Sequence, residues 1–200
     1  MKYTVLVNGE KRTVGVPERM PLLWVLRDAM DLKGTKFSPL KQITPQNVTH
    51  LEPAWTHRNG DMAAAQGAPS SVSAQSTPIL LPPEAGEHLV YCTPFNRVIA
   101  LDPASGRERW AHDPQVRRTS ERPYRCRGVA YARMPQPDAG GACQHRIYTA
   151  TGDRRLIALD ARDGRRCAGF GDRGVVTLAE HARYGLEEVG TSSPPAVANG

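Results

Sequence analysis

Four cysteines offer the first candidate chemistry in the chain: Cys92, Cys126, Cys143 and Cys167. Four cysteines allow three disulfide pairings, and an oxidising compartment would favour such bonds. Cys126, Cys143 and His145 are also three possible zinc ligands, but the closely paired cysteines of structural zinc sites are missing. The sequence therefore favours disulfides or buried thiols over a metal, and it leaves the pairing open.

A glycine-rich segment, GFGDRG at 169–174, matches the GxGxxG pattern of dinucleotide-binding loops. That fingerprint needs a strand before it, a helix after it and an acidic residue ~20 positions further on. Here an apparent strand, VVTL, follows the glycines. We interpret the segment as a loop connecting blades of the repeated fold described below. No GxSxG, HExxH or P-loop motif is present, and the histidines lack partners at ligand or triad spacing.

Basic residues give the chain a formal net charge of +6, and their densest cluster is RRTSERPYRCR at 117–127. Such a cluster could contact phosphates, but Glu121 and Pro123 interrupt it and no nucleic-acid motif surrounds it. A solvated loop is therefore predicted, and nucleic acid is not an expected partner. No apolar run approaches the ~20 residues of a membrane span, and the N-terminus alternates like a strand, so we expect neither a membrane span nor a signal peptide in this chain.

The elements that must position these residues begin with a predicted β-hairpin. Residues Lys2 to Val7 and Thr13 to Val16 flank Asn8-Gly9, a dipeptide that favours tight hairpin turns. Pro21 suits the first turn of a helix, and apolar residues then recur at helical spacing. A hairpin and one helix of this size cannot bury a stable core alone.

From Ser38 onwards, short strand signals alternate with turns, and two segments repeat. RVIALDPASGRERW begins at Arg97 and RLIALDARDGRRCA begins at Arg155, and their landmark residues align at one constant offset. Each predicts an apolar strand, a turn that begins with Asp and closes with Gly, and a polar strand, which together form a hairpin. A hairpin repeated at fixed spacing is typical of a β-propeller, because each sheet buries its faces only against its neighbours.

Residues 1–37 resemble the N-terminus of the [2Fe-2S] subunit of the xanthine dehydrogenase and isoquinoline oxidoreductase family. The resemblance rests on VNGEKRTVGVP and PLLWVLRDAMDLKGTKF, and it implies a truncated ferredoxin-like leader of β-grasp type. In that family, the equivalent of GTKF runs into a loop that carries the cluster cysteines. Here SPLKQIT follows Phe37 and the next cysteine is Cys92, so no [2Fe-2S] cluster is expected.

Residues 38–200 resemble the start of the PQQ-dependent (quinoprotein) dehydrogenases, in the branch similar to membrane-bound glucose dehydrogenase. Seven blocks carry the resemblance in order: SPLKQITPQNVTHLEPAWTHRNGD, STPIL, LVYCTPFNRVIALDPASGRERW, CRGVAYAR, CQHRIYTAT, RLIALDARDGR and TSSPPAV. The predicted fold is mainly β, with about two blades of an eight-bladed propeller. Two domains, 1–37 and 38–200, are therefore predicted with a junction near Phe37 and Ser38. All lysines precede residue 42, and this shift in composition supports a junction near that position.

The resemblance implies a periplasmic or inner-membrane-associated enzyme that holds PQQ and a divalent cation, Ca²⁺ or Mg²⁺. Such enzymes oxidise a sugar or an alcohol and pass electrons to ubiquinone or a cytochrome, and the cofactor carries the chemistry. Three positions match the family's cofactor contacts: Gln75, Arg127 and Ser192. Phe95 stands where some glucose-oxidising members have histidine, which puts a preference for glucose in doubt.

The resemblance places the catalytic Asp, the metal ligands and the remaining blades beyond Gly200. These residues alone are therefore not expected to turn over substrate, and we expect the missing C-terminal blades as a partner. Two alternatives remain at this point: a non-catalytic propeller-type binding module, and an electron-transfer iron–sulfur subunit of a molybdenum hydroxylase.

Overall fold

The chain is described by a computed structural model that covers residues 2–7, 10–17, 42–61, 72–116, 125–178 and 193–197. It divides into two compact units, Met1–Glu52 and Pro53–Gly200. The predicted helix after Pro21, the junction near Ser38 and the residue Ser192 lie outside the described residues.

The first unit contains the predicted N-terminal hairpin. Strand β1 (Lys2–Val7) pairs antiparallel with β2 (Glu10–Gly15), and Lys2 lies opposite Gly15. The hydroxyls of Thr4 and Thr13, which are cross-strand partners, form a hydrogen bond of 2.8 Å. The predicted hairpin is confirmed, although its second strand begins earlier than Thr13. A 3₁₀ turn, η2 (Val48–His50), follows later in this unit.

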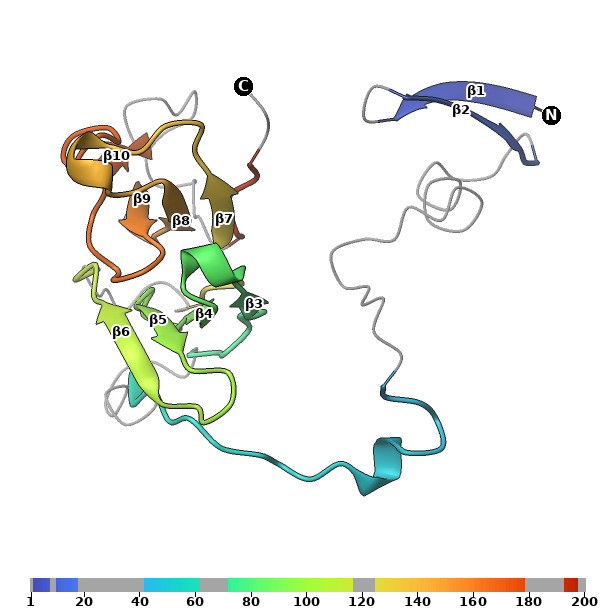
Figure 1. Ribbon diagram of the computed structural model, residues 1–200, viewed down its shortest axis with the longest axis horizontal. Helices are drawn as coiled ribbons and strands as arrows, with labels where there is room; N and C mark the ends of the chain where they lie inside the picture. Colours follow the sequence, from blue (N-terminus) through green and yellow to red (C-terminus); the bar gives the residue numbers. More distant parts are fainter. Residues whose placement is uncertain are drawn as a thin grey trace. The chain divides into compact units, whose positions relative to one another are not determined.

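The second unit contains two four-stranded antiparallel sheets (Figure 1). The first sheet consists of β3 (Ile79–Leu80), β4 (Leu89–Cys92), β5 (Val98–Leu101) and β6 (Glu108–His112). The second consists of β7 (Ala130–Arg133), β8 (His145–Ala150), β9 (Arg155–Asp160) and β10 (Val175–Thr177). Strands lie side by side in chain order in both sheets, as in a propeller blade. The predicted mainly-β fold with about two blades is confirmed.

The repeat seen in the sequence is also a repeat of hydrogen bonds. Thr93 donates its backbone N–H to the carbonyl of Arg97 over 2.8 Å, and Thr151 donates to Arg155 over 2.9 Å. In both turns the threonine hydroxyl also accepts from the backbone N–H of the arginine, over 3.2 Å and 3.1 Å. The two sheets are therefore built by the same local rules at equivalent positions of the two repeats.

Trp110 on β6 joins the first sheet to the second. Its indole N–H donates to the carbonyl of Ala161 over 3.2 Å, and the side chain is 8% exposed. Its ring occupies the space above Gly164, where an added Cβ would lie 2.4 Å from the indole. Gly164 has φ +72°, so glycine suits both the backbone and the close approach of the ring.

Trp55 makes the same contact with the first sheet from the segment 53–61. Its indole N–H donates to the carbonyl of Pro103 over 3.0 Å, and a Cβ on Gly106 would lie 2.4 Å from its ring. Pro103 and Ala161 occupy equivalent positions in the two repeats. Residues 53–61 thus cover one face of the first sheet in the way that β6 covers the second.

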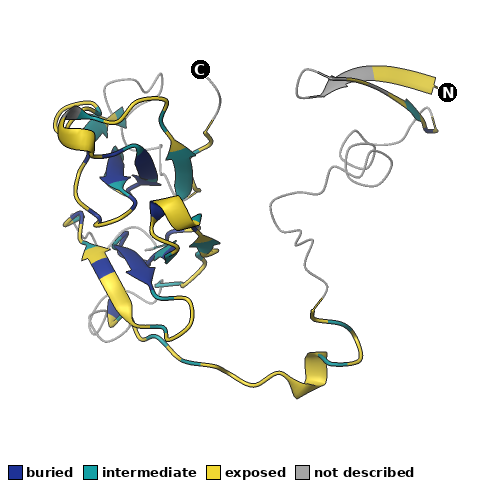
Figure 2. Cartoon of the chain, viewed as in Figure 1, coloured by how far each residue is buried: buried dark blue, intermediate teal, exposed yellow. Residues whose placement is uncertain are grey.

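The main core lies between the two sheets. Along β9, Ile157 and Leu159 belong to this core, while Ala158 points to the other face, as alternation along a strand requires. Figure 2 shows the buried residues concentrated in the central strands β5, β8 and β9, while most of β6 is exposed. The core residues from the strands of the first sheet are Val90, Cys92, Val98, Ala100 and Trp110.

The outer strand of the second sheet is interrupted. Arg166 forms one bridge with Leu159, the chain then leaves the sheet, and β10 returns with Val175 opposite Ile157. The glycine-rich segment 169–174 forms this excursion, so its interpretation as a loop between blades is wrong: it lies within one blade. A strand does follow it, as the sequence indicates, and the dinucleotide-binding alternative has no support.

Candidate cofactor-binding site

We call the end of each sheet at which its first strand, β3 or β7, begins the leading end. The candidate site lies at this end. Strand β4 runs towards this end, and β5 leaves it, so the turn 93–97 lies there together with the residues before β3. The turn 151–155 occupies the same place in the second sheet. The two turns are in contact, because the backbone N–H of Gly152 donates to Oδ1 of Asn96 over 3.1 Å.

Two of the three predicted cofactor contacts meet at the leading end. Nε of Arg127 donates to Oε1 of Gln75 over 3.3 Å, and both residues are exposed. They are separated by 52 residues in the chain. In the described part of the chain, the terminal nitrogens of Arg127 make no hydrogen bond or ion pair.

The backbone around this pair is held closely. Thr77 donates its N–H to the carbonyl of Arg127 over 3.0 Å. A side chain at the buried Gly128 would lie 3.5 Å from the carbonyl oxygen of Thr77 and 3.6 Å from the ring of Pro194. Three segments, 75–77, 126–128 and 193–197, therefore converge here. Ser192 itself is not described; of the described residues that follow it, Pro194 lies next to Gly128.

A disulfide joins segment 126–128 to the end of β4. Cys92 at the end of β4 is bonded to Cys126, which precedes Arg127. The second disulfide joins Cys143 to Cys167 within the second sheet. The zinc alternative for Cys126, Cys143 and His145 is therefore wrong, because the two cysteines belong to different disulfides.

The turn 93–97 is supported by a buried carboxylate that the sequence analysis missed. Asp61 is 2% exposed, and its Oδ1 accepts from Nη2 of Arg97 over 2.7 Å. Its Oδ2 accepts from the backbone N–H of Phe95 over 2.9 Å. Phe95 is 5% exposed, so the Asp61–Arg97 pair holds a buried aromatic residue in the turn beside the site. No local sequence pattern marks Asp61, since both partners come from a different part of the chain.

A second polar contact links residues 53–61 to the first sheet. Nδ1 of His57 and the hydroxyl of Tyr91 are 2.9 Å apart, and burial raises the pKa of Tyr91 above its usual value of 10.0. The Tyr91 hydroxyl is therefore protonated at neutral pH, as this hydrogen bond with His57 allows. This contact stabilises the fold and lies outside the exposed pair.

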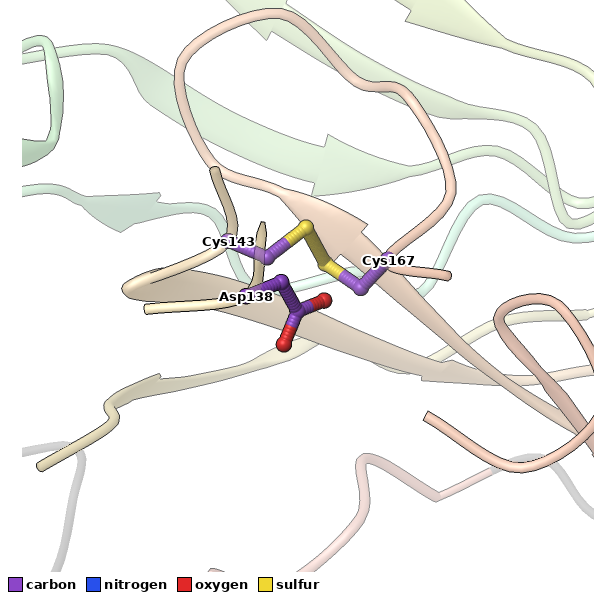
Figure 3. Close-up of side chains that lie close together, drawn as sticks. All are labelled: Asp138, Cys143 and Cys167. Atoms are coloured by element: carbon purple, nitrogen blue, oxygen red, sulfur yellow. A yellow bond between two sulfur atoms is a disulfide. The ribbon is translucent and has the colours of Figure 1, made fainter. Parts of the chain in front are cut away.

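The described residues contain one group of acidic and sulfur side chains close enough to share a metal ion, Asp138 with Cys143 and Cys167 (Figure 3). The two sulfurs are bonded to each other, so neither is a free thiolate. Asp138 instead pairs with Nη2 of Arg146 and accepts from the backbone N–H of Gly169. The group is thus a structural contact and does not fit a metal.

Comparisons with known proteins identify a family for this chain. Residues 28–200 match the family described as "PQQ: Glucose/ethanol/alcohol dehydrogenase, beta-propeller domain". The quinoprotein glucose dehydrogenase of Escherichia coli (strain K12) is 37% identical over 173 residues, which cover 82% of this chain and 21% of that protein. The glycerol dehydrogenase large subunit of Gluconobacter oxydans (strain 621H) is 37% identical over 172 residues, covering 82% and 22%.

A solved structure is also similar to the chain. The quinohemoprotein alcohol dehydrogenase from Comamonas testosteroni has 24% identity and a TM-score of 0.41, and the match covers 56% of this chain and 14% of that chain. The present chain thus spans about a fifth of the length of the curated relatives that it matches. With its two blades and its matched residues 28–200, the chain belongs to the PQQ-dependent glucose, ethanol and alcohol dehydrogenase β-propeller family.

Proposed function

We propose that the chain supplies cofactor contacts to a PQQ-dependent oxidoreductase that oxidises a sugar or an alcohol. The observation that carries this proposal is the exposed pair of Gln75 and Arg127 at the leading end. PQQ, when bound, supplies the electron-accepting quinone for the oxidation. In this proposal the electrons pass on to ubiquinone or a cytochrome, and the remaining blades complete the enzyme.

The residues of the pair fit the chemistry of the cofactor. PQQ carries carboxylates, and a guanidinium can donate two parallel hydrogen bonds to a carboxylate, a geometry that an ammonium cannot reproduce. Arg127 uses only Nε within the described part of the chain, which leaves its terminal nitrogens for a carboxylate. The amide of Gln75 keeps its two N–H donors for a carboxylate or a ring oxygen. Ser192 is proposed as a third contact, through its hydroxyl.

No described residue is proposed as catalytic or as a ligand of the divalent cation. The only grouped candidate in the described residues, around Asp138, does not fit a metal. We propose that a Ca²⁺ or Mg²⁺ ion, with the catalytic carboxylate, is held by parts of the whole enzyme outside these residues.

We further propose a periplasmic or inner-membrane-associated location. Two disulfides support it, because disulfides persist in oxidising compartments. Among the described residues, no helix has the length and apolar character needed to cross a bilayer. The boundary between a leader of 1–37 and a propeller segment of 38–200 also stays a proposal; the family match begins at residue 28.

A titration of the 200-residue chain with PQQ, in which binding is measured by the quenching of tryptophan fluorescence, tests the proposal. Arg127→Lys should weaken binding about tenfold, because the bidentate contact is lost while the charge is kept. Arg133→Lys is the matched control, since Arg133 is an exposed arginine at the end of β7 remote from the pair. Equal PQQ affinity of both variants, or no binding by the native chain, would contradict the proposal.

A further inference from the structure

The Cys92–Cys126 disulfide connects the two sheets directly beside the exposed pair. Cys92 is the last residue of β4, and Cys126 lies ahead of β7. Both are buried, at 1% and 2% exposure. The other disulfide lies in the second sheet alone, between Cys143 before β8 and Cys167 after β9.

Hydrogen bonds connect both halves of this disulfide to the segment that carries Gln75. The backbone N–H of Cys92 donates to Oγ of Ser76 over 3.2 Å, and the same oxygen lies 3.5 Å from Sγ of Cys92. On the other half, Thr77 donates its N–H to the carbonyl of Arg127 over 3.0 Å. Gln75 is therefore next in sequence to Ser76, which is held by Cys92, and Arg127 is next to Cys126.

The side chains of Gln75 and Arg127 cannot fix their relative position by their own contact. Both side chains are exposed, and a single hydrogen bond of 3.3 Å joins them. An exposed interaction of this kind is weak, and ordering an arginine and a glutamine costs side-chain entropy. The buried disulfide and its backbone contacts are the rigid part of the site.

We propose that Cys92 and Cys126 are positioning residues for cofactor binding: their bond holds Gln75 and Arg127 at the spacing that PQQ requires. This inference rests on the proposed function. The Cys143–Cys167 bond has no such role, because it lies in the second sheet at the opposite end.

The test compares the native chain with two double variants, Cys92→Ala/Cys126→Ala and Cys143→Ala/Cys167→Ala. PQQ affinity and the hydrogen exchange of the Thr77 amide are measured for each, with the Asp102 amide at the opposite end of the first sheet as the internal reference. Loss of the Cys92–Cys126 bond should weaken PQQ binding and speed Thr77 exchange by about tenfold each, because the carbonyl acceptor on Arg127 is no longer fixed. The control variant should stay within about twofold of the native chain in both measurements.

A second comparison separates positioning from general stability. Arg127→Lys should weaken PQQ binding about tenfold in the native background but only about twofold without the Cys92–Cys126 bond, since residues that act together are not additive. Equal losses in the two backgrounds, or equal PQQ affinities of the two double variants, would overturn the inference. If the Cys92→Ala/Cys126→Ala chain does not fold, Ser76→Ala tests the hydrogen bond through which Cys92 holds the segment of Gln75. This variant should weaken PQQ binding about threefold, and an unchanged affinity would overturn the inference.

Failure of the native chain to bind PQQ would contradict the proposed function. Thr77 exchange would still decide whether the bond positions the pair, and an exchange rate that is equal in all chains would overturn the inference.

Discussion

The two sheets share the same turn hydrogen bonds but differ in what covers their faces. The first sheet is covered on one face by the second sheet and on the other by residues 53–61, through Trp55 and His57. The second sheet packs on the first, and among the described residues its other face carries a small cluster around Cys143 and Cys167 with Phe170. The difference shows that the burial of a sheet face depends on the segment that packs against it.

The position equivalent to Trp110 illustrates the point. In the second repeat this position is Ala168, next to Cys167. The second sheet therefore has no tryptophan there to contact a following turn, and its interrupted outer strand is fastened by the Cys143–Cys167 bond.

Removal of the two tryptophans gives the largest expected difference between the sheets. Trp110→Ala should lower the free energy of unfolding by about 3–5 kcal/mol, because the ring is buried between the sheets. Trp55→Ala should cost about half as much, since Trp55 is only half-buried. Urea unfolding of both variants measures this, and equal costs would show that the two contacts are equivalent.

The disulfide of the second sheet should contribute about 3 kcal/mol by restricting the unfolded chain. Cys143→Ala/Cys167→Ala should therefore unfold at a lower urea concentration than the native chain, with the loss arising in the second sheet. Hydrogen exchange along β9 and β10 locates the loss. Unchanged stability would mean that the bond is not needed to fasten the interrupted strand.

Alanine substitutions at the glycines that contact the two tryptophans should also destabilise the second sheet more than the first, but by a smaller amount. Gly164→Ala should cost about 1–3 kcal/mol, because the residue has φ +72° and the new Cβ would meet the buried ring of Trp110. Gly106→Ala should cost less, because Trp55 is partly exposed and can move away. Thermal unfolding midpoints of the two variants measure the difference. A larger loss of stability for Gly106→Ala than for Gly164→Ala would show that Trp55 makes the tighter contact.

The smallest expected effect is a pH dependence at the boundary of the sheets. Burial, aided by Arg166, lowers the pKa of His112 below its usual value of 6.5. The unfolded chain therefore binds more protons than the folded chain just below pH 6.5, so stability decreases as the pH falls through this range. His112→Gln should reduce this slope between about pH 7 and pH 5, and an unchanged slope would show that other groups cause it.

Local patterns in the sequence predicted the hairpins of the fold well. The turn residues Asn8-Gly9 and the repeated Asp-to-Gly turns at Asp102 and Asp160 mark reversals that depend on nearby residues alone. The glycine-rich segment 169–174 was assigned to a connection between blades, because periodicity does not show that β10 returns to the sheet that the chain has just left.

The site was predictable only in part. Gln75 and Arg127 were chosen one by one from a family resemblance, and their contact across 52 residues depends on the packing of two sheets. The disulfide pairing and the burial of Asp61 depend on the same tertiary arrangement, which no short motif encodes. Ser192 and the leader before Ser38 remain predictions.

Our central claim is that the leading end of two neighbouring blades contacts PQQ, and hydrogen exchange of the native chain with and without PQQ tests it most directly. We expect added protection at the leading end, at the amides of Thr77 and Cys92, and none at the opposite turns that contain Gly106 and Gly164. Protection at those opposite turns, or no change at Thr77 and Cys92 under saturating PQQ, would contradict the claim.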